Sequence, residues 1–310
     1  MSENHIVLGA AGVSGRSLIK ALQESGKTVT AVARSEHFSE IEQRSADLLD
    51  PDQAMHAVAG ASHVYICVGL PYSSRIWQRD WPALMRNVVN ACEQTGARLI
   101  FLDNVYMYGP TPLSHPFDES HPQDPPTRKG KARKQTAEIL LEAHREGRVQ
   151  AVIGRSADFY GPEVTASMLY ISVLERMLQG KAPQAIGPLN TPHTYAYVPD
   201  NARALIALAE EPSAYGEVWH LPVSKPVTIK EAVAEMNRTL ETGFTPSQVP
   251  RPVLKLMGLF IQPIRELGEM LYQFDEPYIM DDSAFRRKFP GFKATRFQQG
   301  IEAMVKSFQK

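Results

Sequence analysis

The sequence is poor in cysteine, nearly neutral in charge and without a long apolar run. Two cysteines occur in 310 residues and no CxxC pair is present, which excludes a disulfide-built fold and argues against a cysteine zinc site. The 33 basic and 34 acidic residues give a formal net charge of -1, so no nucleic-acid-binding surface is indicated. We expect Cys67 and Cys92 to be buried free thiols in a reducing compartment.

Membrane signals are also missing. The most membrane-like segment, "VLKLMGLFIQPI" at 253–264, is interrupted by Lys255, Gln262 and Pro263. It is also shorter than the ~20 apolar residues that a spanning helix needs. The start of the chain lacks the basic and apolar regions of a signal peptide. These absences predict a cytoplasmic protein that binds neither membrane nor nucleic acid.

The sequence does contain a regular alternation of strand-like and helix-like segments. Apolar runs of strand length cover 5–10, 28–34, 63–70, 97–104 and 149–162, and helical patterns cover 13–25 and 81–96, with Pro82 in a first turn. Strands alternating with helices predict a Rossmann-type doubly wound parallel sheet of the α/β class. The second half is rich in proline, with helical stretches at 199–210, 228–241 and 264–273, and indicates a smaller lobe.

A glycine-rich turn joins the first predicted strand to the first predicted helix. "GAAGVSGR" places Gly9, Gly12 and Gly15 three residues apart. Such glycines allow a tight turn, close approach of the backbone to a pyrophosphate, and packing of helix on strand. The helix N-terminus adds amide donors for the anion. A plain turn would have the same glycines, but the position between strand and helix favours dinucleotide binding.

The end of the second predicted strand indicates which dinucleotide is bound. An acidic residue there would bind the ribose of NAD, whereas Arg34 and Ser35 occupy this point. A guanidinium suits a 2′-phosphate, although a solvated surface arginine is the alternative. We therefore expect NADP, with NAD possible. Asp47 and Leu48, further along, are placed to contact the adenine.

These motifs resemble the short-chain dehydrogenase/reductase superfamily, and within it the extended and atypical NAD(P)-dependent epimerase/dehydratase-like branch. The resemblance rests on "GAAGVSG", "FLDNVYMYGP", "GRSADFYGPEV", "YVPDNARALIALAE" and "DSAFRRKFPGF" and covers nearly the whole chain. It implies a seven-stranded sheet and a C-terminal substrate lobe, here a Rossmann domain over 1–160 with later segments threading back, and mainly a substrate lobe over 161–310. The expected cofactor contacts are Gly9, Ala11, Gly12, Val13, Ser14, Gly15, Arg34, Ser35, Asp47, Leu48, Val68, Gly69, Asp158 and Phe159.

The family's catalytic residues transfer incompletely to this chain. The resemblance implies a Ser or Thr that polarises the substrate oxygen, a Tyr that moves the proton, and a Lys that binds the nicotinamide ribose. Asn104 stands in the first position and can still donate a hydrogen bond. Lys134 matches the lysine, although Lys131 and Arg133 lie nearby and leave the register open, or it is a surface residue paired with Glu138. Gly130 replaces the tyrosine and has no proton to give.

Other residues are candidates for the missing proton donor. Tyr106 is the first choice, since it follows Asn104 at the strand end where open α/β sheets bind ligands, although it could also be a packing residue. Asp158 could carry a proton if desolvation raised its pKa. His193 is a further candidate, although a lone loop histidine is usually solvated. His115 and His121 lack readable metal-site geometry, and we expect no metal.

Two functions remain open at this stage. The first is an NADP-dependent oxidoreductase or epimerase, acting by hydride transfer on a small carbonyl, alcohol or sugar-like substrate with an active site that lacks the usual Tyr. The second is a non-catalytic NADP(H)-binding redox sensor or regulatory protein, in which Gly130 records lost chemistry. The chain is expected to be a monomer, or a homodimer formed through the helices over 81–96 and 130–146.

Overall fold

The chain folds into two compact units. The computed structural model describes residues 3–34, 38 and 41–309. Unit 1 comprises 1–107, 128–156 and 201–221, and unit 2 comprises 108–127, 157–200 and 222–310. Each unit is therefore assembled from three separate stretches of sequence. The expected roles of a cofactor-binding and a substrate-binding part stay predictions.

Unit 1 contains a seven-stranded sheet in which every pair of neighbouring strands is parallel. Its order is β10-β6-β5-β4-β1-β2-β3, so the chain winds outward in both directions from β1. The strands are β1 (Asn4–Leu8), β2 (Thr28–Val32), β3 (Glu42–Arg44), β4 (His63–Ile66), β5 (Arg98–Asp103), β6 (Ala151–Arg155) and β10 (Val218–His220). The predicted doubly wound Rossmann-type sheet is confirmed.

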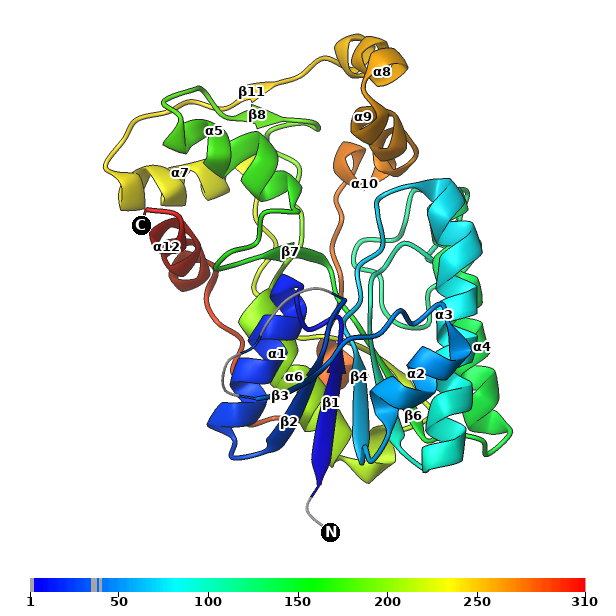
Figure 1. Ribbon diagram of the computed structural model, residues 1–310. Coiled ribbons are helices and arrows are strands. Elements are labelled where there is room, and N and C mark those ends of the chain that lie inside the picture. The colour runs from blue at the N-terminus through cyan, green and yellow to red at the C-terminus, as the bar shows by residue number, and fades with distance from the viewer. Residues whose placement is uncertain (1–2, 35–37, 39–40, 310) are drawn as a thin grey trace. The chain divides into compact units, whose positions relative to one another are not determined.

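Helices cover both faces of this sheet (Figure 1). They are α1 (Val13–Glu24), α2 (Pro51–Val58), α3 (Ser74–Thr95), α4 (Arg128–Arg145) and α6 (Val198–Glu210), the last in unit 1 from Asn201 onward. Successive side chains of a strand point to opposite faces. Ile6 and Leu8 accordingly pack into the core beneath α2, α3 and α4, while α1 and α6 cover the other face.

Two expected boundaries are wrong. The run at 149–162 is two strands, since β6 belongs to the large sheet whereas β7 (Asp158–Tyr160) pairs with β9 (Tyr195–Tyr197) in unit 2. Pro82 lies inside α3, not in a first turn, because the helix begins at Ser74. The missing proline N–H costs α3 one hydrogen bond. Burial of Trp77 and Trp81 on the same helix offsets that loss.

Unit 2 contains two small parallel sheets and several helices. The sheets are β7 with β9, and β8 (Gln184–Ala185) with β11 (Ser247–Gln248). The helices are α5 (Glu175–Leu178), α7 (Ile229–Leu240), α8 (Arg251–Phe260), α9 (Gln262–Leu267), α10 (Tyr272–Asp275), α11 (Ser283–Lys288) and α12 (Phe297–Ser307). A π-helical segment covers Leu169–Leu174, and 3-10 turns cover Pro212–Ala214 in unit 1 and Gly268–Met270 in unit 2. The continuous helix expected over 264–273 is thus broken into shorter pieces.

The core of unit 2 gathers side chains from α7, α12, the π-helical segment and the β7–β9 pair. Tyr160 is fully buried there, and a Cβ on Gly300 would lie 2.6 Å from its hydroxyl oxygen. Tyr160 is therefore a packing residue of this core.

Two smaller expectations can be checked. Cys67 and Cys92 are free and buried, as predicted. Within the described residues, no helix combines the length and the apolar character needed to cross a membrane.

Candidate cofactor-binding and active site

The glycine-rich turn between β1 and α1 is packed so closely that two of its residues must lack a side chain. Gly9 has φ +83°, and a Cβ there would lie 2.7 Å from the Cα of Val68. A Cβ on Gly15 would overlap the carbonyl oxygen of Gly9. Gly12 is the N-cap of α1 and offers no side-chain cap. The turn is thus tight and leads directly into the N-terminus of α1, an arrangement that fits a diphosphate.

The next candidates follow β2 and β3. Arg34 is exposed and lies just past β2, where its carbonyl oxygen accepts a hydrogen bond from Ser45 Oγ at 3.1 Å. Ser35 lies outside the described residues. Asp47 is exposed and accepts the Leu49 N–H at 3.1 Å, whereas Leu48 is buried in the core. An adenine contact by Leu48 would therefore use its backbone.

The loop after β4 completes the neighbourhood of the glycine turn. Val68 is partly buried, and its Cα packs against Gly9. A Cβ on Gly69 would have open space within 4 Å. The predicted residues Gly9, Val68 and Gly69 are thus brought together at the carboxyl ends of β1 and β4.

The end of β5 holds the predicted polarising residue. Asn104 follows Asp103 directly, and its Oδ1 accepts the N–H of Tyr106 at 3.1 Å. This bond fixes the amide and leaves the Nδ2 group as a donor. Tyr106 is partly buried and stacks on Trp77, with ring centroids 6.0 Å apart and planes 16° apart. Its ring therefore packs on the helical layer, the alternative that the sequence had left open.

The basic residues of helix α4 differ in how deeply they are buried. Lys134 is partly exposed and lies 3.8 Å from Glu138, which is the surface pair considered as its alternative role. Lys129 is fully buried, with its amine 4.5 Å from the centre of the Tyr72 ring. Arg133 is also buried. Sequence reasoning missed Lys129 and considered Arg133 only as a neighbour of Lys134, because it followed the register of Gly130 and Lys134.

Arg133 belongs to a buried charge cluster under the end of β5. Asp103 Oδ1 accepts hydrogen bonds from Arg133, with Nε at 2.8 Å, and from the N–H of Asn104, also at 2.8 Å. Asp103 Oδ2 lies 3.5 Å from Nε of Arg155. The Arg133 guanidinium also lies 4.1 Å from the Trp81 ring centroid. One carboxylate thus joins two guanidiniums and orients the backbone of Asn104.

Unit 2 joins two residues that the sequence analysis had considered separately. His193 Nε2 lies 2.9 Å from Asp158 Oδ2. His193 is only 5% exposed and stacks on Phe274, so the expectation of a solvated loop histidine is wrong. The buried hydroxyl of neighbouring Tyr195 has a pKa raised by desolvation and then by Asp158, which keeps it neutral. Asp158 and His193 form a pair that can hold or pass a proton.

A pocket in unit 2 adjoins this pair. Its walls are Met168, Leu169, Ser172, Ala185, Ile186, Gly187, Pro188, Thr191, His193, Tyr195, Ile229 and Phe274. The walls are mostly apolar, with a few polar groups, as in many small-molecule sites. Phe159, expected to contact the cofactor, lies on β7 next to Asp158 and is partly buried.

Comparisons with known proteins agree with this architecture. The family model described as NAD dependent epimerase/dehydratase family matches residues 5–221. The dTDP-4-dehydrorhamnose reductase of Streptomyces griseus is 27% identical over 262 residues, covering 81% of this chain and 80% of that protein. Protein y4nL of Sinorhizobium fredii (strain NBRC 101917 / NGR234) is 24% identical over 204 residues, which span 59% of this chain but only 56% of y4nL.

A solved structure shares the fold over the full length. The UDP-glucuronic acid 4-epimerase from Bacillus cereus, in complex with UDP-glucuronic acid and NAD, has a TM-score of 0.81 at 17% identity. The alignment covers 99% of each chain.

Proposed function

Because the chain belongs to the NAD dependent epimerase/dehydratase family, we propose that it binds a nicotinamide dinucleotide and transfers hydride to or from a small carbonyl, alcohol or sugar-like substrate. The observation that carries this proposal is the turn over Gly9, Gly12 and Gly15, which opens α1 and has no room for a Cβ at Gly9 or Gly15. The bound dinucleotide would supply the hydride carrier. The protein would supply binding, orientation and proton transfer.

NADP is the proposed cofactor, although the B. cereus epimerase was solved with NAD. Arg34 is exposed at the end of β2, where its guanidinium can reach a 2′-phosphate. Arg34→Ala should weaken NADP(H) binding by about 1.5–3 kcal/mol, the worth of a charged hydrogen bond, with little effect on NAD(H). Arg86→Ala removes another exposed arginine, on α3, and serves as the control. Equal losses for both cofactors would show that Arg34 does not bind the phosphate.

The proposed reaction uses an atypical set of residues. Asn104 would donate from Nδ2 to the substrate oxygen, since its Oδ1 is already bonded to the N–H of Tyr106. Lys134 would contact the nicotinamide ribose, and Tyr106 would move the proton in place of the tyrosine that Gly130 replaces. The Asp158–His193 pair is the rival proton carrier, supported by its 2.9 Å contact.

Hydride-transfer assays test the reaction. NADPH oxidation should be followed against a panel of small carbonyl compounds and nucleotide-linked keto sugars. Asn104→Ala should lower kcat by about 10²–10³, as for loss of an oxyanion donor. Tyr106→Phe and His193→Gln distinguish the two proton carriers, because only the variant of the true carrier should change the pH profile of kcat.

The alternative is a non-catalytic NADP(H)-binding redox sensor or regulator. Gly130 and the surface pairing of Lys134 with Glu138 favour it. Tight NADPH binding without oxidation by any member of the panel would reject the enzymatic proposal and support this alternative. Failure to bind either dinucleotide would reject both.

A further inference from the structure

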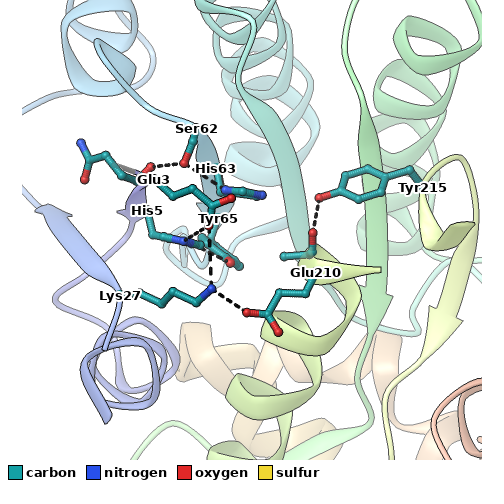
Figure 2. A network of polar contacts seen from close by, with 10 residues as sticks. Glu3, His5, Lys27, Ser62, His63, Tyr65, Glu210 and Tyr215 are labelled. Carbon is teal, nitrogen blue, oxygen red and sulfur yellow. Dashed lines mark hydrogen bonds and ion pairs between the residues drawn. The ribbon is translucent and has the colours of Figure 1, made fainter. Parts of the chain in front are cut away.

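A cluster of potential metal ligands lies where β1 and β4 begin, at the end of the unit 1 strands opposite the glycine turn (Figure 2). His5 of β1 and His63 of β4 are direct register partners on neighbouring parallel strands. Glu3 precedes His5 by two residues, so its side chain leaves the chain on the same face. Strand pairing therefore brings together residues that are far apart in sequence.

The three side chains are close enough to share an ion after small movements. One ligand atom from each of Glu3, His5 and His63 lies within 4.8 Å of the other two. His5 Nε2 and Glu3 Oε2 are already 3.7 Å apart. The two imidazoles stack with centroids 4.7 Å apart and planes 6° apart. Ligands of a tetrahedral zinc ion lie about 3.3 Å from one another, given Zn–N bonds of about 2.0–2.1 Å.

Hydrogen-bond contacts occupy Nδ1 of each ring, which leaves Nε2 as the nitrogen available to a metal. Ser62 Oγ donates to the Asn4 carbonyl at 2.9 Å, so its 3.0 Å contact with His63 Nδ1 must be donated by the ring. His63 Nε2 then carries the lone pair. His5 Nδ1 lies 3.1 Å from the Tyr65 hydroxyl. His5 Nε2 is buried and has no hydrogen-bond partner among the described residues.

Both rings are buried and held in place. His5 is 1% and His63 5% exposed. Imidazoles oriented by hydroxyl groups at Nδ1 match the oriented histidine ligands of metal sites.

Nearby charges set the strength of binding. Lys27 opposes a cation, since its amine lies 3.8 Å from Glu3 Oε2. The same amine lies 2.8 Å from Glu210, which is its closer partner. Lys27 can therefore release Glu3 while it keeps an ion pair with Glu210.

We propose that Glu3, His5 and His63 bind a transition-metal dication of the zinc type, with Nε2 of both rings and the Glu3 carboxylate as ligands. The rings tilt from parallel so that their Nε2 atoms converge, and solvent at exposed Glu3 fills the fourth position. Zinc and cobalt suit such a nitrogen–oxygen set, whereas calcium and magnesium prefer oxygen ligands. The ion links the first residues of β1 to β4. It lies at the amino ends of these strands, whereas the glycine turn lies at their carboxyl ends.

The test is a metal titration of the full chain without a histidine tag. Chelator-treated protein is titrated with Co²⁺, followed by its visible absorption, and with Zn²⁺ in competition with a chromophoric chelator. Wild type should take up one equivalent. Glu3→Gln and His63→Gln should each weaken binding at least about tenfold. Lys27→Met should strengthen it by removing the opposing charge. His56→Gln, which removes an exposed histidine of α2, should change nothing.

The outcomes separate the metal site from a purely structural network. Glu3 is 58% exposed, so Glu3→Gln keeps the test valid even if the buried His63 variant fails to fold. No uptake by wild type, or equal uptake by wild type and Glu3→Gln, would overturn the proposal. Because no dinucleotide is present in the titration, its result is independent of the proposed enzymatic function.

Discussion

Replacement of Asp103 by asparagine should be among the most damaging single changes in unit 1. The variant keeps the shape of the side chain but removes the carboxylate that joins Arg133 and Arg155. Asp103 is 1%, Arg133 3% and Arg155 0% exposed. Both buried guanidiniums would then lose the negative charge that they share.

The size of the effect follows from this imbalance. Removal of one partner from a buried ion pair costs about 3–5 kcal/mol, because the remaining charge stays desolvated. A typical domain is stable by only about 5–15 kcal/mol, so Asp103→Asn should remove at least about a fifth of that margin. Arg133→Met should cost less. This variant keeps the contact between Asp103 and Arg155. The methionine side chain still fills the space beside Trp81 and Phe101.

Denaturant titration followed by tryptophan fluorescence measures these effects. The three tryptophans of the chain, Trp77, Trp81 and Trp219, all lie in unit 1, so the signal reports on that unit. The double variant Asp103→Asn/Arg133→Met should be less destabilised than the sum of the single variants by at least about 1 kcal/mol. A loss below about 1 kcal/mol for Asp103→Asn, or strict additivity in the double variant, would refute the reasoning.

Three further predictions concern other parts of the chain. Gly15→Ala should weaken NADPH binding at least about tenfold in a fluorescence titration, because its Cβ would overlap the Gly9 carbonyl oxygen and push α1 from the turn; unchanged affinity would contradict the tight turn. Glu231→Ala should lower stability at neutral pH by about 0.5–1.5 kcal/mol, since the Glu231 carboxylate accepts the Thr228 N–H at 2.7 Å at the start of α7. Hydrogen bonding to Thr228 lowers the pKa of Glu231 below its ordinary 4.5, so this stabilisation is complete above pH 4.5 and should disappear as the pH falls through the lower value, which circular dichroism can follow. Cys67 and Cys92 should resist iodoacetamide in the native state at about pH 8 and react in denaturant, because burial raises both thiol pKa values to about 12; rapid native labelling seen by mass spectrometry would be the contrary result.

Sequence patterns predicted those parts of the site that are formed by residues close together in the sequence. The glycine turn could be predicted because strand, turn and helix are consecutive and the steric demands on Gly9 and Gly15 are local. The fold class followed from alternating strands and helices. The strands β3 and β10 escaped detection, since three residues each are too few for a periodic pattern.

The charge cluster could have been found with a stricter use of helical periodicity. Thr136, Ala137 and Leu140 lie three, four and seven positions after Arg133, and all of them are buried. That stripe places Arg133 on the inner face of α4 and Lys134 toward solvent. Family register alone pointed to Lys134 instead.

Long-range pairs could not be read from the sequence. His5 and His63 meet only because β1 pairs with β4 in one particular register, and a shift by one residue would separate the side chains to opposite faces. The Asp158–His193 pair likewise depends on the pairing of β7 with β9, where Asp158 lies opposite Tyr195.

The three-part composition of unit 1 has a consequence for biosynthesis. Strand β10 ends at His220, so the ribosome must release more than two thirds of the chain before the seventh strand can pair with β6. Until then β6 has an open edge, which can pair with strands of other chains and promote aggregation. A fragment cut near residue 160 would keep that edge permanently, and expression of residues 1–160 alone should therefore give insoluble protein unless residues 201–221 are attached.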